Sequence, residues 1–208
     1  MSLIATLLDF VLHIDTHLAD IISTYGTLTY AILFAIIFGE TGLVIAPFLP
    51  GDSLLFVTGV FAAQGTLNIW ILASLLFIAA ILGDATNYAL GHNGGTKIFG
   101  KFIRQEHIKK TENFFAKHGA KAIVLARFMP IIRTVAPFVA GIGSMNYRTF
   151  LIYNITGAFC WVGFFLFGGY FFGNIPFVQD NLAHIIYAIV IISIIPALVE
   201  YLRHKRNN

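Results

Sequence analysis

Long apolar runs, separated by short polar stretches, make up most of this chain. A helix needs about 20 apolar residues to cross the roughly 30 Å hydrocarbon core of a bilayer. Three runs meet that length with few interruptions and are predicted to be transmembrane helices: 68–90, 149–173 and 182–202. Two further apolar regions, 28–66 and 122–145, contain charged residues, glycines and prolines that a plain spanning helix does not accommodate.

The first 27 residues mix apolar positions with acids and histidines. These polar positions are Asp9, His13, Asp15, His17 and Asp20. A helix with this pattern suits the membrane interface better than the bilayer core. We therefore predict an interfacial helix in 1–27, and we expect it to be retained because it lacks the basic start of a signal peptide.

The region 28–66 is interrupted by two prolines and a glycine in the stretch Pro47–Gly51. The apolar piece that follows, Ser53–Ala63, would extend only about 16 Å as a helix, which is too short to cross the bilayer. This arrangement predicts a re-entrant hairpin, in which one arm enters the membrane and a short arm returns to the same side.

The distribution of charge predicts a second hairpin in 122–145. All 13 lysines and arginines follow residue 96, and they make a basic loop of 91–121 and a basic tail of 203–208. The positive-inside rule places both segments in the cytoplasm. Because the spans 149–173 and 182–202 lie between them, 122–145 must enter and leave the membrane on one side.

These features predict an all-α integral membrane protein built as an inverted repeat of two re-entrant helical hairpins plus transmembrane helices. The halves share only a short similarity, FLP at Phe48–Pro50 and FMP at Phe128–Pro130. The span between the hairpins makes them enter from opposite sides. In transporters, broken helices of this kind meet near the midplane and form the binding site.

The composition agrees with one membrane domain over residues 1–208. The chain is 58% hydrophobic and 11% charged, whereas an average soluble domain is about 25% charged. The segment GHNGGTK lacks the Gly-Lys-Ser/Thr order of a phosphate-binding loop, and no HExxH motif is present. The sequence thus predicts no enzymatic activity, no metal, no cofactor and no nucleic-acid partner, and it permits a homo-oligomer.

Four charged residues lie within the two predicted hairpins, namely Glu40, Asp52, Arg127 and Arg133. Each would cost about 2.5–3.5 kcal/mol at the bilayer centre if it were unpaired. The acids belong to the first hairpin and the arginines to the second, so pairing between the hairpin tips would recover much of this cost. We therefore expect the two hairpins to meet at these residues.

Several of these residues also have simpler interpretations. Asp52 follows Pro50 and Gly51 and could cap the short helix behind it. Arg127 could extend to the cytoplasmic interface instead of a ligand. Asp84, on the span 68–90, could support the site or make a helix contact.

The residue types favour binding of a lipid phosphate coupled to protons. Arginine presents a planar fork that fits phosphate oxygens, and Arg127 and Arg133 are the candidate phosphate contacts. Carboxylates in a low-dielectric site can exchange protons, so Glu40 and Asp52 are candidates for proton coupling. Supporting positions are Asp84, Pro50, Gly51, Pro130 and Pro137.

At these residues the sequence resembles the DedA family, part of a wider superfamily of membrane lipid transporters and scramblases. The resemblance rests on three segments: ETGLVIAPFLPGDSLLF (Glu40–Phe56), GDATNY (Gly83–Tyr88) and ARFMPIIRTVAPFVAGIGSMNYRTF (Ala126–Phe150). It implies opposed re-entrant hairpins and a dependence on the acids and arginines named above. It also implies lipid movement in envelope homeostasis, with undecaprenyl phosphate or phosphatidylethanolamine as the lipid, driven in several members by the proton motive force.

The leading hypothesis is a proton-coupled flippase for a phosphate-bearing lipid, first undecaprenyl phosphate and second a phospholipid. We expect it in the bacterial inner membrane as a multi-pass protein with a cytoplasmic C-terminus. A proton or ion carrier with indirect effects on lipids is the main alternative. A lipid phosphatase would need a positioned nucleophile and base, and no histidine lies in either hairpin.

Overall fold

The computed structural model of the chain describes residues 13–42, 51–99 and 105–189. All regular structure within these ranges is helical. The elements in chain order are α2 (Ile14–Tyr25), η1 (Gly26–Leu28), α3 (Thr29–Gly42), α4 (Gly51–Ala63), α5 (Ile69–Phe99), α6 (Gln105–His118), η2 (Gly119–Lys121), α7 (Ala122–Ala126), α8 (Pro130–Ile142), α9 (Tyr147–Val162), the π-helical η3 (Gly163–Phe167), α10 (Gly168–Phe172) and α11 (Pro176–Asp180).

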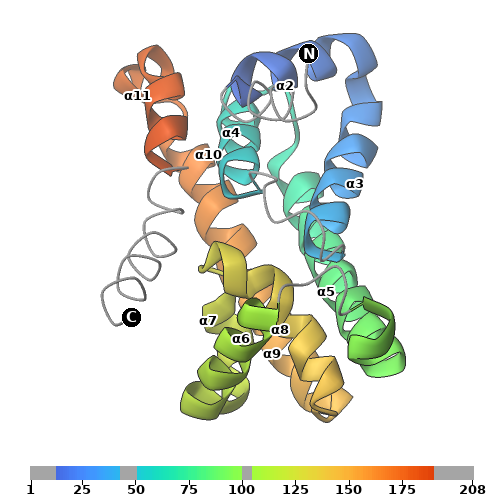
Figure 1. Cartoon of the computed structure of the whole chain (residues 1–208). Helices are drawn as coiled ribbons and strands as arrows, with labels where there is room; N and C mark the ends of the chain where they lie inside the picture. The colour runs from blue at the N-terminus through green and yellow to red at the C-terminus, as the bar shows by residue number, and fades with distance from the viewer. Residues whose placement is uncertain (1–12, 43–50, 100–104, 190–208) are drawn as a thin grey trace, which may run out of the picture.

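The helices divide the molecule into two halves joined by two long elements. In Figure 1, α2, α3 and α4 lie in the upper half, and α6, α7 and α8 lie in the lower half. Helix α5 and the continuous run from α9 to α10 extend through both halves. Helix α5 packs against α3 and α8, whereas α4 packs against α10 and α7 packs against α9. The two halves therefore share a scaffold made of α5 and α9–α10.

Within the described residues, three helical stretches are long and apolar enough to cross a membrane: Ile14–Gly42, Ile69–Gly94 and Tyr147–Phe172. The second and third confirm the apolar helices predicted at 68–90 and 149–173. The first combines α2, η1 and α3, and the chain bends at Gly26, whose φ is +51°. Figure 1 shows α2 lying across the end of the molecule while α3 runs along it.

The basic segment 91–121, which the sequence predicts to be a cytoplasmic loop, is helical over most of its described residues, and its cytoplasmic position stays a prediction. Helix α5 continues to Phe99, and α6 and η2 fill much of the remaining segment. The reason is an apolar face on α6, where Ile108 and Phe115 pack against α8 while polar residues such as Lys109 and Lys117 are exposed. A basic segment can thus be helical when one face has a partner.

The break predicted inside 122–145 is present between α7 and α8. Helix α7 ends at Ala126, and α8 begins at Pro130 after three non-helical residues. Met129 is extended (φ −124°, ψ 103°), because a proline disfavours the helical conformation in the residue before it. Four predicted features lie outside the described residues: positions 1–12, the turn around Pro47 and Pro50, most of the span 182–202, and the tail 203–208.

Glycines allow the helices of the scaffold to approach closely. A Cβ placed on Gly169 of α10 would lie 1.9 Å from the Phe56 carbonyl oxygen of α4, and one on Gly59 would lie 2.1 Å from the Leu166 carbonyl oxygen. Without Cβ atoms at these positions the backbones come together, as is usual for membrane helices. This contact fixes α4 against the run from α9 to α10.

Substitution Gly169→Ala is expected to destabilise the protein by about 1–3 kcal/mol, because the added methyl group meets rigid backbone. The neighbouring Gly168 has open space around it and supplies the matched control, Gly168→Ala. Thermal unfolding in detergent compares the two variants. Equal melting temperatures would contradict the close contact between α4 and α10.

Candidate functional site

Five charged residues, from four helices and from the break between α7 and α8, meet in the interior between the two halves. Glu40 lies near the described end of α3, Asp52 in the first turn of α4, and Asp84 in the middle of α5. Arg127 follows the last residue of α7, and Arg133 lies in the first turn of α8. The structure thus brings together the four charged residues predicted from the hairpins and Asp84, which the sequence offered as a supporting residue or a helix contact.

Arg133 lies between two carboxylates. Its Nη2 is 2.9 Å from Oε1 of Glu40, and its Nη1 donates to Oδ1 of Asp52 at 3.0 Å. The side chains of Arg133 and Glu40 are 6% and 4% exposed, and that of Asp52 is 16% exposed. The expected pairing of acids on one hairpin with an arginine on the other is therefore present.

Trp161 of α9 completes this group, although the sequence analysis did not identify it. Its Nε1 donates to Oδ1 of Asp52 at 2.8 Å, and the centroid of its ring is 4.1 Å from Cζ of Arg133. Tryptophan usually lies at membrane interfaces. A tryptophan in the middle of the apolar run 149–173 was the signal that could have revealed it.

Arg127 forms a second ion pair beside the first. Its Nη2 donates to Oδ2 of Asp84 at 2.6 Å and to Oδ1 of Asn154 at 2.6 Å. The side chain is 2% exposed, so the interpretation that it extends to the interface is wrong. Cζ of Arg127 is 5.9 Å from the centroid of the Trp161 ring, which links the two ion pairs into one cluster.

Asn87 connects the backbones on either side of the cluster. Its Nδ2 donates to the Thr41 carbonyl oxygen at 3.3 Å and to the Thr134 carbonyl oxygen at 2.8 Å. Thr41 follows Glu40, and Thr134 follows Arg133. One amide on α5 thus holds the two positions next to the central ion pair, and its place three residues after Asp84 was the only sequence signal for this role.

The predicted supporting residues fit local requirements. A Cβ on Gly51 would lie 2.0 Å from Oε2 of Glu40, and the Gly51 amide donates to Oε1 of Glu40 at 3.3 Å. Pro137 lies inside α8 and cannot donate to the carbonyl oxygen of Arg133 four residues earlier. Pro130 begins α8, and Pro50 lies outside the described residues.

The capping interpretation of Asp52 does not account for its contacts. Asp52 is inside the first turn of α4, and its Oδ1 accepts from Arg133 and Trp161. The backbone amide at the start of α4 is instead bonded to Glu40. The Asp52 side chain is therefore an acceptor within the charged cluster.

The dipole of α8 acts unfavourably on Arg133. A cation is disfavoured near the N-terminus of a helix, and Arg133 lies in the first turn of α8. The ion pairs with Glu40 and Asp52 offset this effect, so a change that separates Arg133 from these acids exposes the cation to the helix N-terminus.

The cluster carries unequal numbers of positive and negative groups. Three carboxylates and two guanidinium groups give a formal sum of −1, so one bound proton would make it neutral. Nε and Nη1 of Arg127 and Nε of Arg133 find no acceptor among the described residues. These donors and the surplus carboxylate could bind an anionic group and a proton. No group of three metal-binding side chains occurs in the described part of the chain.

An open hollow of about 480 Å³ lies elsewhere, between α5 and the start of α9. It is lined by residues that include Tyr88, His92 and Tyr147. Tyr88 donates from its hydroxyl to the Met145 carbonyl oxygen. None of the five charged residues lines this hollow, so the ion-paired cluster is the candidate functional site.

Comparison with known proteins gives consistent matches. The family model of the VTT domain matches residues 49–171. The Escherichia coli K12 protein named Protein DedA is 54% identical over 99% of this chain and 97% of its own length. An uncharacterized membrane protein of Mycobacterium tuberculosis H37Rv is 40% identical over 88% and 82%. Inner membrane protein YghB of E. coli K12 is 33% identical over 83% and 78%. No solved structure matches the chain.

Breaking the Arg127–Asp84 pair from one side is expected to cost about 3–5 kcal/mol, because it leaves a buried charge unpaired. The variants Asp84→Leu and Arg127→Leu test each side, and the double variant removes both charges. Detergent unfolding should show the double variant losing much less than the sum of the single losses. Additive losses would contradict a direct ion pair.

Proposed function

Because the chain belongs to the DedA family of VTT-domain membrane proteins, we propose that it is a proton-coupled flippase for a phosphate-bearing lipid. Undecaprenyl phosphate is the first candidate lipid, and a phospholipid such as phosphatidylethanolamine is the second. We place the protein in the bacterial inner membrane, as the names of two relatives suggest for those proteins.

The observation that carries this proposal is the burial of Arg133 between Glu40 and Asp52. The two Nη atoms of this arginine already lie 2.9 and 3.0 Å from two carboxylate oxygens, and the same planar fork fits phosphate oxygens. A lipid phosphate can take the place of one carboxylate, and the displaced acid is then a buried charge without a partner. Arg127, with donors that have no acceptor among the described residues, is the second phosphate contact.

Proton coupling follows from the charge of the cluster. Its formal sum is −1 before any ligand enters, and a phosphate monoester adds at least one further negative charge. Buried charge of one sign is costly in a low-dielectric site. Protonation of Glu40 or Asp52 lowers that cost, so entry of the lipid phosphate favours uptake of protons, and loss of the protons favours release of the lipid.

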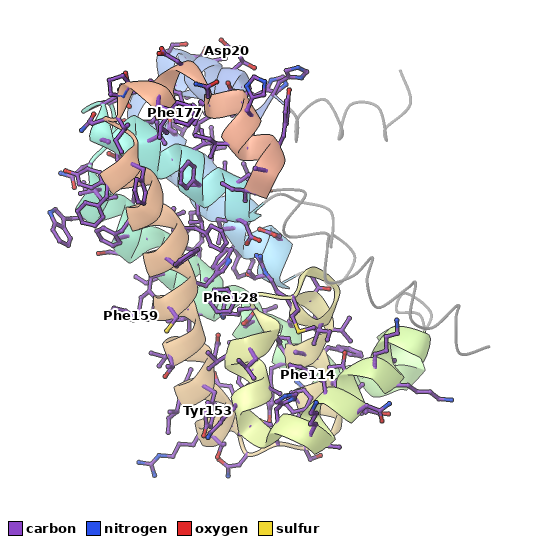
Figure 2. The ribbon with its side chains drawn as sticks, turned by 90° about the vertical axis from the view of Figure 1, so that its left-hand side faces the viewer. Asp20, Phe114, Phe128, Tyr153, Phe159 and Phe177 are labelled. Atoms are coloured by element: carbon purple, nitrogen blue, oxygen red, sulfur yellow. The ribbon has the colours of Figure 1, made fainter. Side chains whose placement is uncertain are left out.

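The arrangement of helices supports opposed re-entrant hairpins as part of this proposal. Helices α3 and α4 lie in one half and α7 and α8 in the other (Figure 1). Figure 2 places Phe128, in the break between α7 and α8, between Phe177 near one end and Tyr153 near the other. We propose that both hairpins reach the midplane, with the basic segment 91–121 and the C-terminus in the cytoplasm.

A carrier of protons alone is the second candidate, because the surplus carboxylate could bind a proton without any lipid. The two functions differ in whether proton movement requires the lipid. Protein-containing vesicles with and without a fluorescent polyprenyl phosphate distinguish them: the flippase moves protons substantially only when that lipid is present.

Substitution Arg133→Ala is expected to reduce lipid translocation to the rate of protein-free liposomes, because the main phosphate contact is lost. Translocation is measured in reconstituted liposomes by the access of an impermeant quencher to the fluorescent polyprenyl phosphate or phosphatidylethanolamine. Arg148→Ala is the matched control, since Arg148 is exposed at the start of α9. Wild-type rates in Arg133→Ala protein at normal levels would refute the role of Arg133.

Substitution Glu40→Gln is expected to abolish the stimulation of translocation by an imposed proton gradient, because glutamine keeps the shape of the side chain but cannot carry the surplus charge. Asp180→Asn, at an exposed position of α11, should respond to the gradient like the wild type. Undiminished stimulation in Glu40→Gln would exclude Glu40 from proton coupling, and the corresponding result for Asp52→Asn would exclude both acids.

A further inference from the structure

Trp161 lies beside both ion pairs of the charged cluster, the one around Arg133 and the one around Arg127. Its side chain is fully buried, its Nε1–H is bonded to Asp52, and its ring faces Arg133 at 4.1 Å. Arg127 lies 5.9 Å from the same ring. A residue that only filled space would not need both its N–H and its π face directed at charged groups.

The two contacts of Trp161 are of a kind that persists when ligands are exchanged. A cation–π contact uses the face of the guanidinium and none of its N–H donors. Arg133 can therefore release a carboxylate and bind a phosphate without leaving the ring. Oδ1 of Asp52 accepts hydrogen bonds from both Arg133 and Trp161. It therefore keeps the bond from the Trp161 N–H after Arg133 has exchanged this carboxylate for a phosphate.

The backbone after Trp161 supports a specific placement of this side chain. The π-helical segment η3 begins at Gly163, two residues beyond Trp161. Such segments are rare and occur often at functional sites. The wider turn changes the register of the helix, so that Trp161 faces the cluster while Gly169, further along, keeps its close contact with α4.

We infer that Trp161 is a positioning residue of the phosphate site, which holds Arg133 on its indole face and Asp52 on its N–H while a lipid phosphate replaces a carboxylate. This inference rests on the proposed function, since it assigns Trp161 a part in binding the same lipid phosphate. It adds a residue whose fluorescence reports directly on occupancy of the site.

A fluorescence titration tests the contact in the intact protein. The chain has two tryptophans, and the other one, Trp70, is 70% exposed. In a Trp70→Phe background the emission comes from Trp161 alone. Addition of dodecyl phosphate in detergent should shift or quench this emission saturably, because the charges beside the ring change. Dodecanol should have no effect, and Arg133→Ala should remove the response.

Inorganic phosphate distinguishes a lipid from a free anion as the ligand. If inorganic phosphate gives the same response at the same concentration as dodecyl phosphate, the ligand is the free anion and the lipid part of the inference is wrong. A response at much lower concentrations of dodecyl phosphate supports a lipid phosphate.

Two variants separate positioning from packing. Trp161→Phe keeps an aromatic face but lacks the N–H, so maximal translocation should fall roughly tenfold with little change in the lipid concentration for half-maximal rate. Trp161→Leu lacks both, and that concentration should also rise roughly tenfold. If both variants lose maximal rate equally and neither changes the half-maximal concentration, Trp161 only fills space and the inference is overturned.

Failure of the inference differs from failure of the proposed function. If wild-type protein translocates lipid and Arg133→Ala does not, but Trp161 emission ignores dodecyl phosphate, the inference fails and the proposed function stands. If wild-type protein neither translocates lipid nor responds to any phosphate compound, the proposed function fails, and the inference fails with it.

Discussion

The burial of an arginine between two acids requires three helical segments to meet at one place. Arg133, Glu40 and Asp52 come from α8, α3 and α4, and each would be costly in the bilayer interior without the others. The break between α7 and α8 becomes understandable from this constraint. A continuous helix could place a charge in the membrane, but it could not also bring a second helix terminus to the same point.

Close backbone packing lets this constraint be met. Where glycine stands at a helix contact, the charged side chains of neighbouring helices can reach one another without a gap. Gly51 leaves room for the carboxylate of Glu40, and a Cβ on Gly157 would lie 3.0 Å from Cδ of Arg127. The glycines therefore contribute to the electrostatics of the site, because the strength of an ion pair depends on the distance between its charged groups.

The sequence alone predicted an all-helical membrane protein, two of the long apolar helices, and the meeting of Arg133 with Glu40 and Asp52. Those predictions succeeded because a charge in an apolar run, such as Glu40 or Arg133, is energetically conspicuous. The sequence did not predict that Arg127 pairs with Asp84 of α5. Asn87 and Trp161 were not identified, because an amide or an indole is common in helices and its role depends on which neighbour lies across the contact. The helical character of α6 was missed for a similar reason, since its partner α8 is not apparent from its basic composition.

Helix α5 presents three unlike contacts within little more than one turn. Gly83 packs against Thr41 and Gly42. Asp84 pairs with Arg127. The side-chain amide of Asn87 donates to the carbonyl oxygens of Thr41 and Thr134. A rotation or axial shift of α5 as a rigid rod must disturb all three at once. The positions of the two halves of the protein are therefore coupled. A displacement of either half is transmitted to the other through this short segment of α5.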